Sequence, residues 1–326
     1  MPVPNYILAS IDISESCYFH RTNNISSFLI NIIKPYELTD KDINFIAETI
    51  KNFTNKNIII KIPTVPTDLH DYFDYYNFLN YKQISFLNIS ELLANIKNID
   101  IKELTIEYPE LKSDINFDLS NKLPPTLKTF KLIINAKSFD LYKLPEGLEN
   151  LVYYNKNHMI GDFYHLPAGL KTLKLTLDHN YPNIISDLPH GLQELYLDFA
   201  YKNSLDFLPQ NLKYLDLRHC REQDKSNLPN TITKLILYNY ANNLPDSVEE
   251  IYLMYIIPTD NFTNKPRNLK KLATFSDACL QKYKSQLTEI EDKVKITLCQ
   301  ENMKYYNRLY EYDSDSTDAM LDVLFD

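Results

Sequence analysis

Residues 208–220, LPQNLKYLDLRHC, contain the pattern that establishes the architecture: Leu208-Pro209 is followed by leucines at 212, 215 and 217. The same pattern, L-P-x-x-L-x-x-L-x-L, recurs along the middle of the chain. Its opening pair lies at 123, 144, 166, 188, 208, 228 and 244, and Lys265-Pro266 continues the series. Eight of the 17 prolines therefore occupy one column of a repeat that is 16 to 22 residues long.

Proline has a structural role at the start of each repeat. It restrains its own φ and pushes the preceding leucine into an extended conformation, which suits a corner just before a strand. The x-L-x-L alternation that follows is typical of a strand with one buried face. So short a unit cannot bury its leucine edge alone, so parallel strands must stack. We predict at least eight parallel strands in one continuous sheet, with these residues inside: Leu132, Leu175, Leu197, Leu217, Leu237 and Leu253.

These residues resemble the leucine-rich repeat, L-x-x-L-x-L-x-x-[NC], which residues 127–135 and 212–220 match through the last position. The Leu-Pro opening and the repeat length resemble more specifically the FNIP (or IP22) repeats of amoebal and giant-virus proteins, over about residues 123 to 275. The resemblance implies an α/β solenoid with stacked parallel strands on a concave face. It also implies protein binding and, in a virus, host–virus interaction.

The ends of the chain are predicted to differ from the middle. Residues 1–120 contain strand-like segments at 6–13, 26–33, 57–62, 83–89 and 101–106, and helix-like segments at 39–51, 67–79 and 90–96. They are either helix-bearing repeat units of the same solenoid, which we favour, or a separate small α/β domain. Residues 121–275 form the short repeats and 276–310 a C-terminal cap with helices at 277–291 and 300–310 around a strand at 293–298. Residues 311–326 are predicted to be a disordered acidic tail.

The composition argues against several classes of function. The four glycines, at 147, 161, 169 and 191, fit neither a G-x-G-x-x-G turn nor a phosphate loop nor a G-x-S-x-G elbow. Six carboxylates of the tail carry much of the net charge of −9, and the remainder lacks the basic surface that nucleic acid requires. No apolar run is long enough to span a membrane, and no signal peptide is visible. The widely separated cysteines, Cys17, Cys220, Cys279 and Cys299, indicate free thiols and an intracellular, cytoplasmic location.

No reactive site is evident among the histidines, cysteines and carboxylates. His158, His165, His179 and His190 recur near repeat boundaries, but no repeat adds an H-x-x-H or a cysteine partner for a metal. Cys220 follows His219, but it falls in the column that leucine-rich repeats bury, where a thiol is unreactive. Glu249 and Glu250 are adjacent in a strand and therefore point to opposite faces. We predict a non-enzymatic protein without catalytic residues, metal or cofactor.

The residues between the leucines are predicted to form a partner-binding surface. They should point to solvent on the concave side of the solenoid, and they include tyrosines, an arginine and carboxylates, a composition typical of protein-binding surfaces. The alternative is that tyrosine is simply common in this chain, which has 25, and that neighbouring rings shield one another. The predicted contacts are Tyr154, Tyr196, Asp198, Tyr214, Asp216, Arg218, Tyr238 and Tyr252.

Two functions are compatible with these features. The first is an interaction scaffold for a protein partner. The sequence specifies neither the identity of this partner nor the oligomeric state of the chain. The second is a substrate-recognition adaptor for ubiquitin ligation, because FNIP-repeat proteins often carry an N-terminal F-box, although the first 50 residues lack its L-P-x-[DE] opening. The acidic tail is expected to dock on a partner, to solubilise the chain or to pack over the open end of the solenoid.

Overall fold

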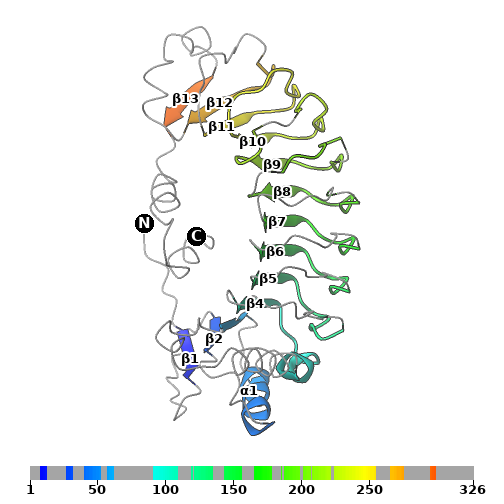
Figure 1. The fold of residues 1–326 in the computed structure, drawn as a ribbon, viewed down its shortest axis with the longest axis vertical. Coiled ribbons are helices and arrows are strands. Elements are labelled where there is room, and N and C mark those ends of the chain that lie inside the picture. Colours follow the sequence, from blue (N-terminus) through cyan, green and yellow to red (C-terminus); the bar gives the residue numbers. More distant parts are fainter. Residues whose placement is uncertain are drawn as a thin grey trace, which may run out of the picture. The chain divides into compact units, whose positions relative to one another are not determined.

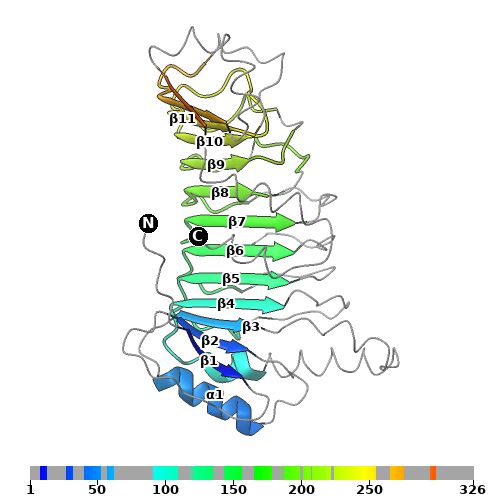
Figure 2. The same cartoon turned by 90° about the vertical axis from the view of Figure 1, so that its left-hand side faces the viewer.

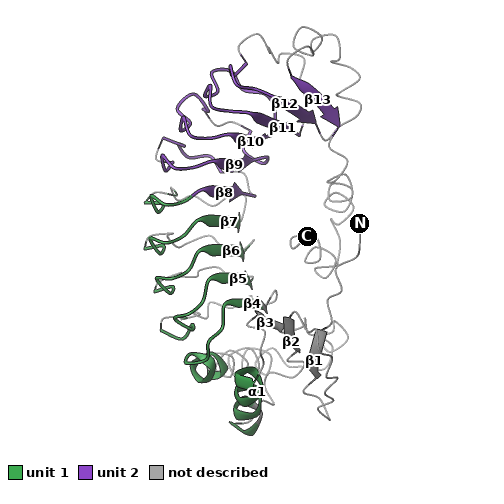
Figure 3. Ribbon diagram, turned by 180° about the vertical axis from the view of Figure 1, so that it is seen from behind, with its two compact units in different colours: residues 1–192 green, residues 193–326 purple. Residues whose placement is uncertain are grey.

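A computed structural model describes residues 8–12, 27–31, 40–52, 57–61, 91–108, 119, 121–134, 143–155, 165–177, 185, 187–198, 201–206, 208–221, 224–254, 265–274 and 294–298. The chain divides into two compact units, residues 1–192 and 193–326 (Figure 3). The division falls within the Leu-Pro repeats and not at the predicted boundary after residue 120. We therefore describe each unit by itself.

The strands of unit 1 pair in parallel in the order of the sequence, and Figure 2 shows them side by side and pointing the same way. Because β4 pairs with β5, strands from both sides of residue 120 belong to one ladder. The strands are β1 (Leu8–Asp12), β2 (Ser27–Asn31), β3 (Asn57–Lys61), β4 (Glu103–Tyr108), β5 (Thr129–Ile134), β6 (Asn150–Asn155) and β7 (Thr172–Leu177).

Unit 2 continues the same pattern, and its strands again pair in parallel with their sequence neighbours (Figure 1). The prediction of stacked parallel strands is confirmed within each unit. The strands are β8 (Glu194–Leu197), β9 (Tyr214–Leu217), β10 (Lys234–Leu237), β11 (Glu250–Leu253), β12 (Lys271–Thr274) and β13 (Lys295–Leu298).

Helices in the described part of the chain lie near its N-terminal end. The helix α1 (Asp40–Asn52) lies between β2 and β3, within one residue of the predicted 39–51, and residues 91–96 are also helical. Apolar side chains spaced by three and four residues form one buried stripe on α1, at Ile43, Ile46 and Ile50. The predicted helices at 67–79, 277–291 and 300–310, the strand at 83–89 and the tail at 311–326 lie outside the described residues.

The leucines form the core of each unit. The register of the parallel ladder places Leu195 of β8 beside Leu215 of β9, and Leu215 beside Leu235 of β10. Leucines at the same position of successive repeats are therefore neighbours. Burial of such side chains removes their full apolar surface from water. The leucines predicted to lie inside are at most 2% exposed: Leu132, Leu175, Leu197, Leu217, Leu237 and Leu253.

The proline column closes a turn before each strand. The Leu212 N–H donates to the Pro209 carbonyl at 3.1 Å, and the same bond to the proline three residues earlier recurs in the other repeats at 3.0 to 3.2 Å. Proline contributes only a carbonyl to this turn, so its missing N–H removes no hydrogen bond. The other donors are the backbone nitrogens of Leu127, Leu148, Leu170, Leu192, Ile232, Val248 and Leu269.

The position two residues after proline lies against the backbone of the preceding repeat. The Thr126 hydroxyl donates to the Ile101 carbonyl at 3.0 Å, and the Ser247 hydroxyl donates to the Ile232 carbonyl at 2.7 Å. Gly169 occupies the same position, where a Cβ would lie 3.3 Å from the Glu146 carbonyl oxygen. The backbone of the preceding repeat comes close at this position. The chain accommodates it either with a hydroxyl that donates to the neighbouring carbonyl or with glycine, which has no Cβ.

The residue before Leu-Pro adopts a left-handed conformation in four of the repeats where this residue is described. Lys143, His165, Asp187 and Asn243 have φ between 56° and 66°, and none of them is glycine. Such a backbone costs an L-residue roughly 1–2 kcal/mol. The turn into the next strand therefore imposes local strain, which the stacking of the strands must offset.

Candidate partner-binding face

We define the strand face of unit 2 as the side chains that point away from the leucine core on β8 to β13 and on the residues that directly follow these strands. Side chains alternate along a strand, so every second residue belongs to this face. Its described members are Glu194, Tyr196, Asp198, Tyr214, Asp216, Arg218, Lys234, Ile236, Tyr238, Glu250, Tyr252, Met254, Lys271, Ala273, Lys295 and Thr297.

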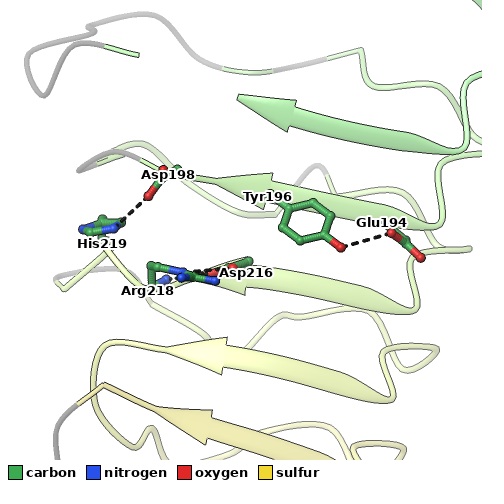
Figure 4. A network of polar contacts seen from close by, with 6 residues as sticks. All are labelled: Glu194, Tyr196, Asp198, Asp216, Arg218 and His219. Carbon is green, nitrogen blue, oxygen red and sulfur yellow. Dashed lines mark hydrogen bonds and ion pairs between the residues drawn. The ribbon is translucent and has the colours of Figure 1, made fainter. Parts of the chain in front are cut away.

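Two half-buried tyrosines pack together at one end of this face. The ring centroids of Tyr196 and Tyr214 lie 4.6 Å apart with the planes tilted by 34°. The Tyr196 hydroxyl donates to a carboxylate oxygen of Glu194 at 3.2 Å (Figure 4). Burial, together with nearby carboxylates, raises the pKa of both phenols. Both tyrosines thus present a neutral, partly apolar ring.

Asp216 of β9 and Arg218, which directly follows β9, form a closed ion pair on the face. The Arg218 Nε lies 3.0 Å from each carboxylate oxygen of Asp216, and the Arg218 backbone N–H donates to Asp216 Oδ1 at 3.1 Å (Figure 4). The Asp216 side chain is 4% exposed and that of Arg218 15%. The prediction that Asp216 faces solvent is therefore wrong, because the side chain two residues later folds back over it.

Asp198 and His219 form a second, more exposed contact. His219 Nε2 lies 2.8 Å from Asp198 Oδ1, and about a third of each side chain is exposed (Figure 4). His219 directly follows Arg218, so the turn after β9 carries two groups that each bind an aspartate. Asp198 and His219 supply the exposed polar groups of this part of the face.

Aromatic rings and lysines alternate from strand to strand between β9 and β12. Lys234 Nζ lies 5.3 Å from the ring centroid of Tyr214 and 5.0 Å from that of Tyr252, while Lys271 Nζ lies 4.7 Å from the Tyr252 centroid. The Tyr252 hydroxyl accepts from Lys271 Nζ at 2.7 Å and donates to Glu250 at 2.8 Å. These cation–π contacts hold the lysine stems flat against the face.

The face also contains a buried apolar cluster, which includes Tyr252 and which the sequence did not reveal. Ile236, Tyr252, Met254 and Ala273 are 1 to 9% exposed, although strand alternation places them opposite the leucine core. The expectation that these four residues, including the predicted contact Tyr252, are exposed to solvent is wrong. Parallel strands lie only about 4.8 Å apart, so large rings shield small neighbours. Tyr214 and Tyr238 are only partly buried and pack against this cluster.

Tyr154 is the one predicted contact that belongs to unit 1. It is half-buried on β6, and the register places it between Ile133 of β5 and Thr176 of β7, which are both buried. It therefore contributes a partly exposed ring to the strand face of unit 1.

Two kinds of residue on the face were missed by reasoning from the sequence. Glu250 lies two residues before the predicted contact Tyr252, and Lys234 lies four residues before Tyr238. Lys271 lies at the equivalent position of β12, so strand alternation places all three on the same face. Arg221 lies beyond the repeat consensus, yet its guanidinium carbon lies 4.3 Å from the ring centroid of Tyr238. The alternation could have identified the first group, whereas no local signal indicates the second.

The thiol beside His219 has the properties of a core residue. Cys220 is fully buried, and burial raises the pKa of its thiol to about 12. Its backbone N–H donates to the Leu217 carbonyl at 3.0 Å. The thiolate that nucleophilic chemistry requires is therefore scarce at neutral pH.

The described carboxylates and histidines do not gather as a metal site. Glu249 contacts Lys270 at 2.8 Å while Glu250 contacts Tyr252, so the adjacent glutamates point to opposite faces as predicted. No three His, Cys, Asp or Glu side chains of the described residues gather as a metal site would require. His165 and His190 are exposed, and His158 and His179 lie outside the described residues.

Comparison with known proteins adds little to this picture. No family model matches the chain, and no curated protein matches it. Among solved structures it is similar to CroV588, described as a novel circular LRR protein, with 14% identity and a TM-score of 0.40. That match covers 84% of this chain and 43% of the other, so the chain spans less than half the length of that structure. No helix within the described ranges has the length and apolar character to cross a membrane. The repeats and parallel ladders of the chain itself make it a leucine-rich-repeat-like solenoid in fold.

Proposed function

We propose that the chain is a non-enzymatic interaction scaffold that binds a protein partner on the strand face of unit 2. The observation that carries the proposal is the group of partly exposed rings at Tyr196, Tyr214 and Tyr238, each held by contacts to its neighbours. A ring that is already held in place loses little side-chain entropy when a partner covers it. Tyrosine is also enriched among residues that dominate binding energy.

The predicted contacts divide into two groups by exposure. Tyr196, Tyr214 and Tyr238 are the proposed anchors, and Asp198 with its partner His219 forms a polar rim. Asp216 and Tyr252 are buried and act as supports beneath the anchors. Arg218 belongs with the supports because its guanidinium holds Asp216, so its loss would perturb the face before it could report on a partner.

Affinity capture from the native cell, followed by a direct binding measurement with the purified partner, tests this assignment. The triple substitution Tyr196→Ala, Tyr214→Ala, Tyr238→Ala should weaken binding by about 2 kcal/mol or more while the thermal melt remains cooperative. Phe45→Ala removes an exposed ring on α1 and is the matched control, which should bind as the wild type. Unchanged binding by the triple variant would move the site away from this face. Tyr154→Ala then shows whether the surface includes unit 1.

The alternative function is substrate recognition for a ubiquitin ligase. Its support is the Leu-Pro repeat, which resembles the FNIP repeats. An intracellular location and a role in host–virus interaction belong to the same proposal. Recovery of a ligase scaffold subunit in the capture would favour the adaptor, whereas recovery of one stable partner without ligase subunits would favour the simple scaffold.

A further inference from the structure

The charges on the strand face of unit 2 are separated by sign. The described residues of β8, β9 and the turn after β9 carry the carboxylates of Glu194, Asp198 and Asp216, of which Asp216 is bound by Arg218. On β10 to β13 the described side chains of the face include Lys234, Lys271 and Lys295 but only one carboxylate, that of Glu250. Arg221, stacked on Tyr238, adds a further cation beside β10. Among the described residues, the four cations Lys234, Lys271, Lys295 and Arg221 and the one carboxylate of Glu250 sum to a charge of +3, and we call this group the basic part of the face.

The same part of the face offers apolar surface. The rings of Tyr214 and Tyr238 are partly exposed and pack on the buried cluster formed by Ile236, Tyr252, Met254 and Ala273. The cation–π contacts of Lys234 spread its methylene stem over the neighbouring rings. A ligand for this surface should therefore combine carboxylates with apolar side chains.

The C-terminal segment of the chain has this composition. Residues 311–326 contain six carboxylates and no lysine or arginine. Its carboxylates are interspersed with apolar side chains in the last seven residues, at Met320, Leu321, Val323, Leu324 and Phe325. A peptide of this kind cannot bury enough apolar surface to fold alone, but it can bind a complementary surface.

The connection between the described structure and this segment is long enough for the segment to reach the basic part of the face. β13 ends at Leu298 and pairs with β12 at the basic end of the face. From β13 to β10 is three strand spacings, roughly 14 Å. An extended chain from Leu298 to Glu311 spans up to about 45 Å. A helix over 300–310 would span roughly 16 Å, so the surface is reachable with either conformation of the connection.

We propose that residues 311–326 bind the basic part of the strand face in the same molecule and compete there with the protein partner. This inference rests on the proposed function, because it assigns the same face to an internal ligand. Carboxylates of the segment pair with Lys234, Lys271, Lys295 and Arg221. The apolar side chains near the terminus cover the rings of Tyr214 and Tyr238. Release of the segment exposes the anchors to the partner.

The absence of tryptophan from the chain allows a clean test in the full-length protein. Phe325→Trp introduces a single tryptophan that preserves an aromatic side chain in the segment. In this variant, emission should be blue-shifted, poorly quenched by acrylamide and independent of protein dilution. Lys234→Glu with Lys271→Glu should shift the emission to longer wavelength and raise the quenching constant. Salt should act in the same direction, because it screens contacts between exposed charges.

Two further variants separate docking from effects on folding. Asp313→Lys, Asp315→Lys and Asp318→Lys change the segment alone and should release the tryptophan while the melting temperature of the solenoid is retained. Lys128→Glu with Lys171→Glu, which alters exposed lysines of unit 1 outside the strand face, is the matched control and should leave the emission unchanged.

Each outcome of these experiments bears on the proposal. A solvent-exposed tryptophan in the Phe325→Trp variant overturns it. So does a buried tryptophan whose emission is unchanged both by the lysine-to-glutamate and by the aspartate-to-lysine substitutions. Loss of burial on dilution would assign the segment to a second copy of the chain and would also overturn it. If the segment proves unbound while Tyr196→Ala, Tyr214→Ala, Tyr238→Ala still abolishes partner binding, the proposed function survives without this inference. If the segment binds and the triple variant still binds its partner, the proposed function fails and the inference reduces to a self-contact.

Discussion

The guanidinium of Arg218 encloses the carboxylate of Asp216, two residues earlier on the same strand face, with Nε 3.0 Å from both oxygens. Asp216 is 3% exposed and lies between Tyr196 and Ile236 in the ladder. A buried carboxylate requires such a partner, because an unpaired charge in this environment carries a large desolvation cost. The ion pair therefore stabilises the face that we assign to binding.

Removal of Arg218 should destabilise the protein more than loss of a surface ion pair. We expect Arg218→Ala to lower the free energy of unfolding by about 3–5 kcal/mol, because Asp216 remains buried without its bound cation. Lys270→Ala, which breaks the exposed contact with Glu249, is the matched control and should cost at most about 1 kcal/mol. Urea denaturation measures both. Equal effects of the two substitutions would contradict the structural role of the pair.

Truncation of a leucine in the stacked columns should be costly. Leu215 is fully buried between Leu195 and Leu235, so Leu215→Ala leaves a cavity that neighbouring repeats fill only in part. We expect a loss of about 2–5 kcal/mol in the free energy of unfolding, and a similar loss for Leu195→Ala. Lys213→Ala, on an exposed position just before β9, should change it by less than about 0.5 kcal/mol. A small effect at Leu215 would contradict the stacked core.

Glycine should stabilise the strained corner before a Leu-Pro pair. Lys143 has φ near 60°, and glycine adopts this conformation without a steric cost. The relief of roughly 1–2 kcal/mol exceeds the added entropy of the unfolded chain, so Lys143→Gly should raise the melting temperature. Glu146→Gly, three residues later and without positive φ, should lower it. Equal signs for the two variants would argue against strain at this corner.

The stability of unit 1 should depend on the ionisation of Glu149. Hydrogen bonds from Lys171 and Lys128, and their charges, lower the pKa of this carboxyl from 4.5 to about 2. A folded-state pKa below the unfolded value means that the contribution is complete above about pH 4.5 and is lost as the pH falls towards 2. Glu149→Gln lacks this contribution. Its melting temperature should therefore fall less between pH 5 and pH 2.5 than that of the wild type, and parallel curves would contradict the assignment.

Much of the fold follows from a one-dimensional pattern. Each repeat contacts mainly its neighbours, so the leucine and proline columns already specify parallel strands, their buried side and the turn before each. Leu215 is an example, since its position in the pattern is sufficient to predict that it is buried. The helix at residues 40–52 was equally predictable, because its apolar stripe and its N-terminal Thr39 are local signals.

The face opposite the leucines depends on contacts that the pattern does not encode. Asp198 and Asp216 lie in neighbouring repeats and both follow the leucine columns, yet one is partly exposed and the other is buried. The difference arises because Asp216 lies in register between Tyr196 and Ile236 and beneath the side chain of Arg218. Arg221 likewise reaches Tyr238 from outside the repeat consensus.

Repetition therefore predicts the leucine core but not the composition of the binding face. Local spacing along the chain determines which residues point inward, because a strand alternates its side chains regardless of their identity. Burial on the other face is determined by the size and charge of the side chains that the ladder places next to one another, as for Ile236 beside Tyr252. The same holds for the left-handed backbone before a Leu-Pro pair, which Lys143 adopts although lysine has no special preference for it, and which the geometry of the stacked turns requires.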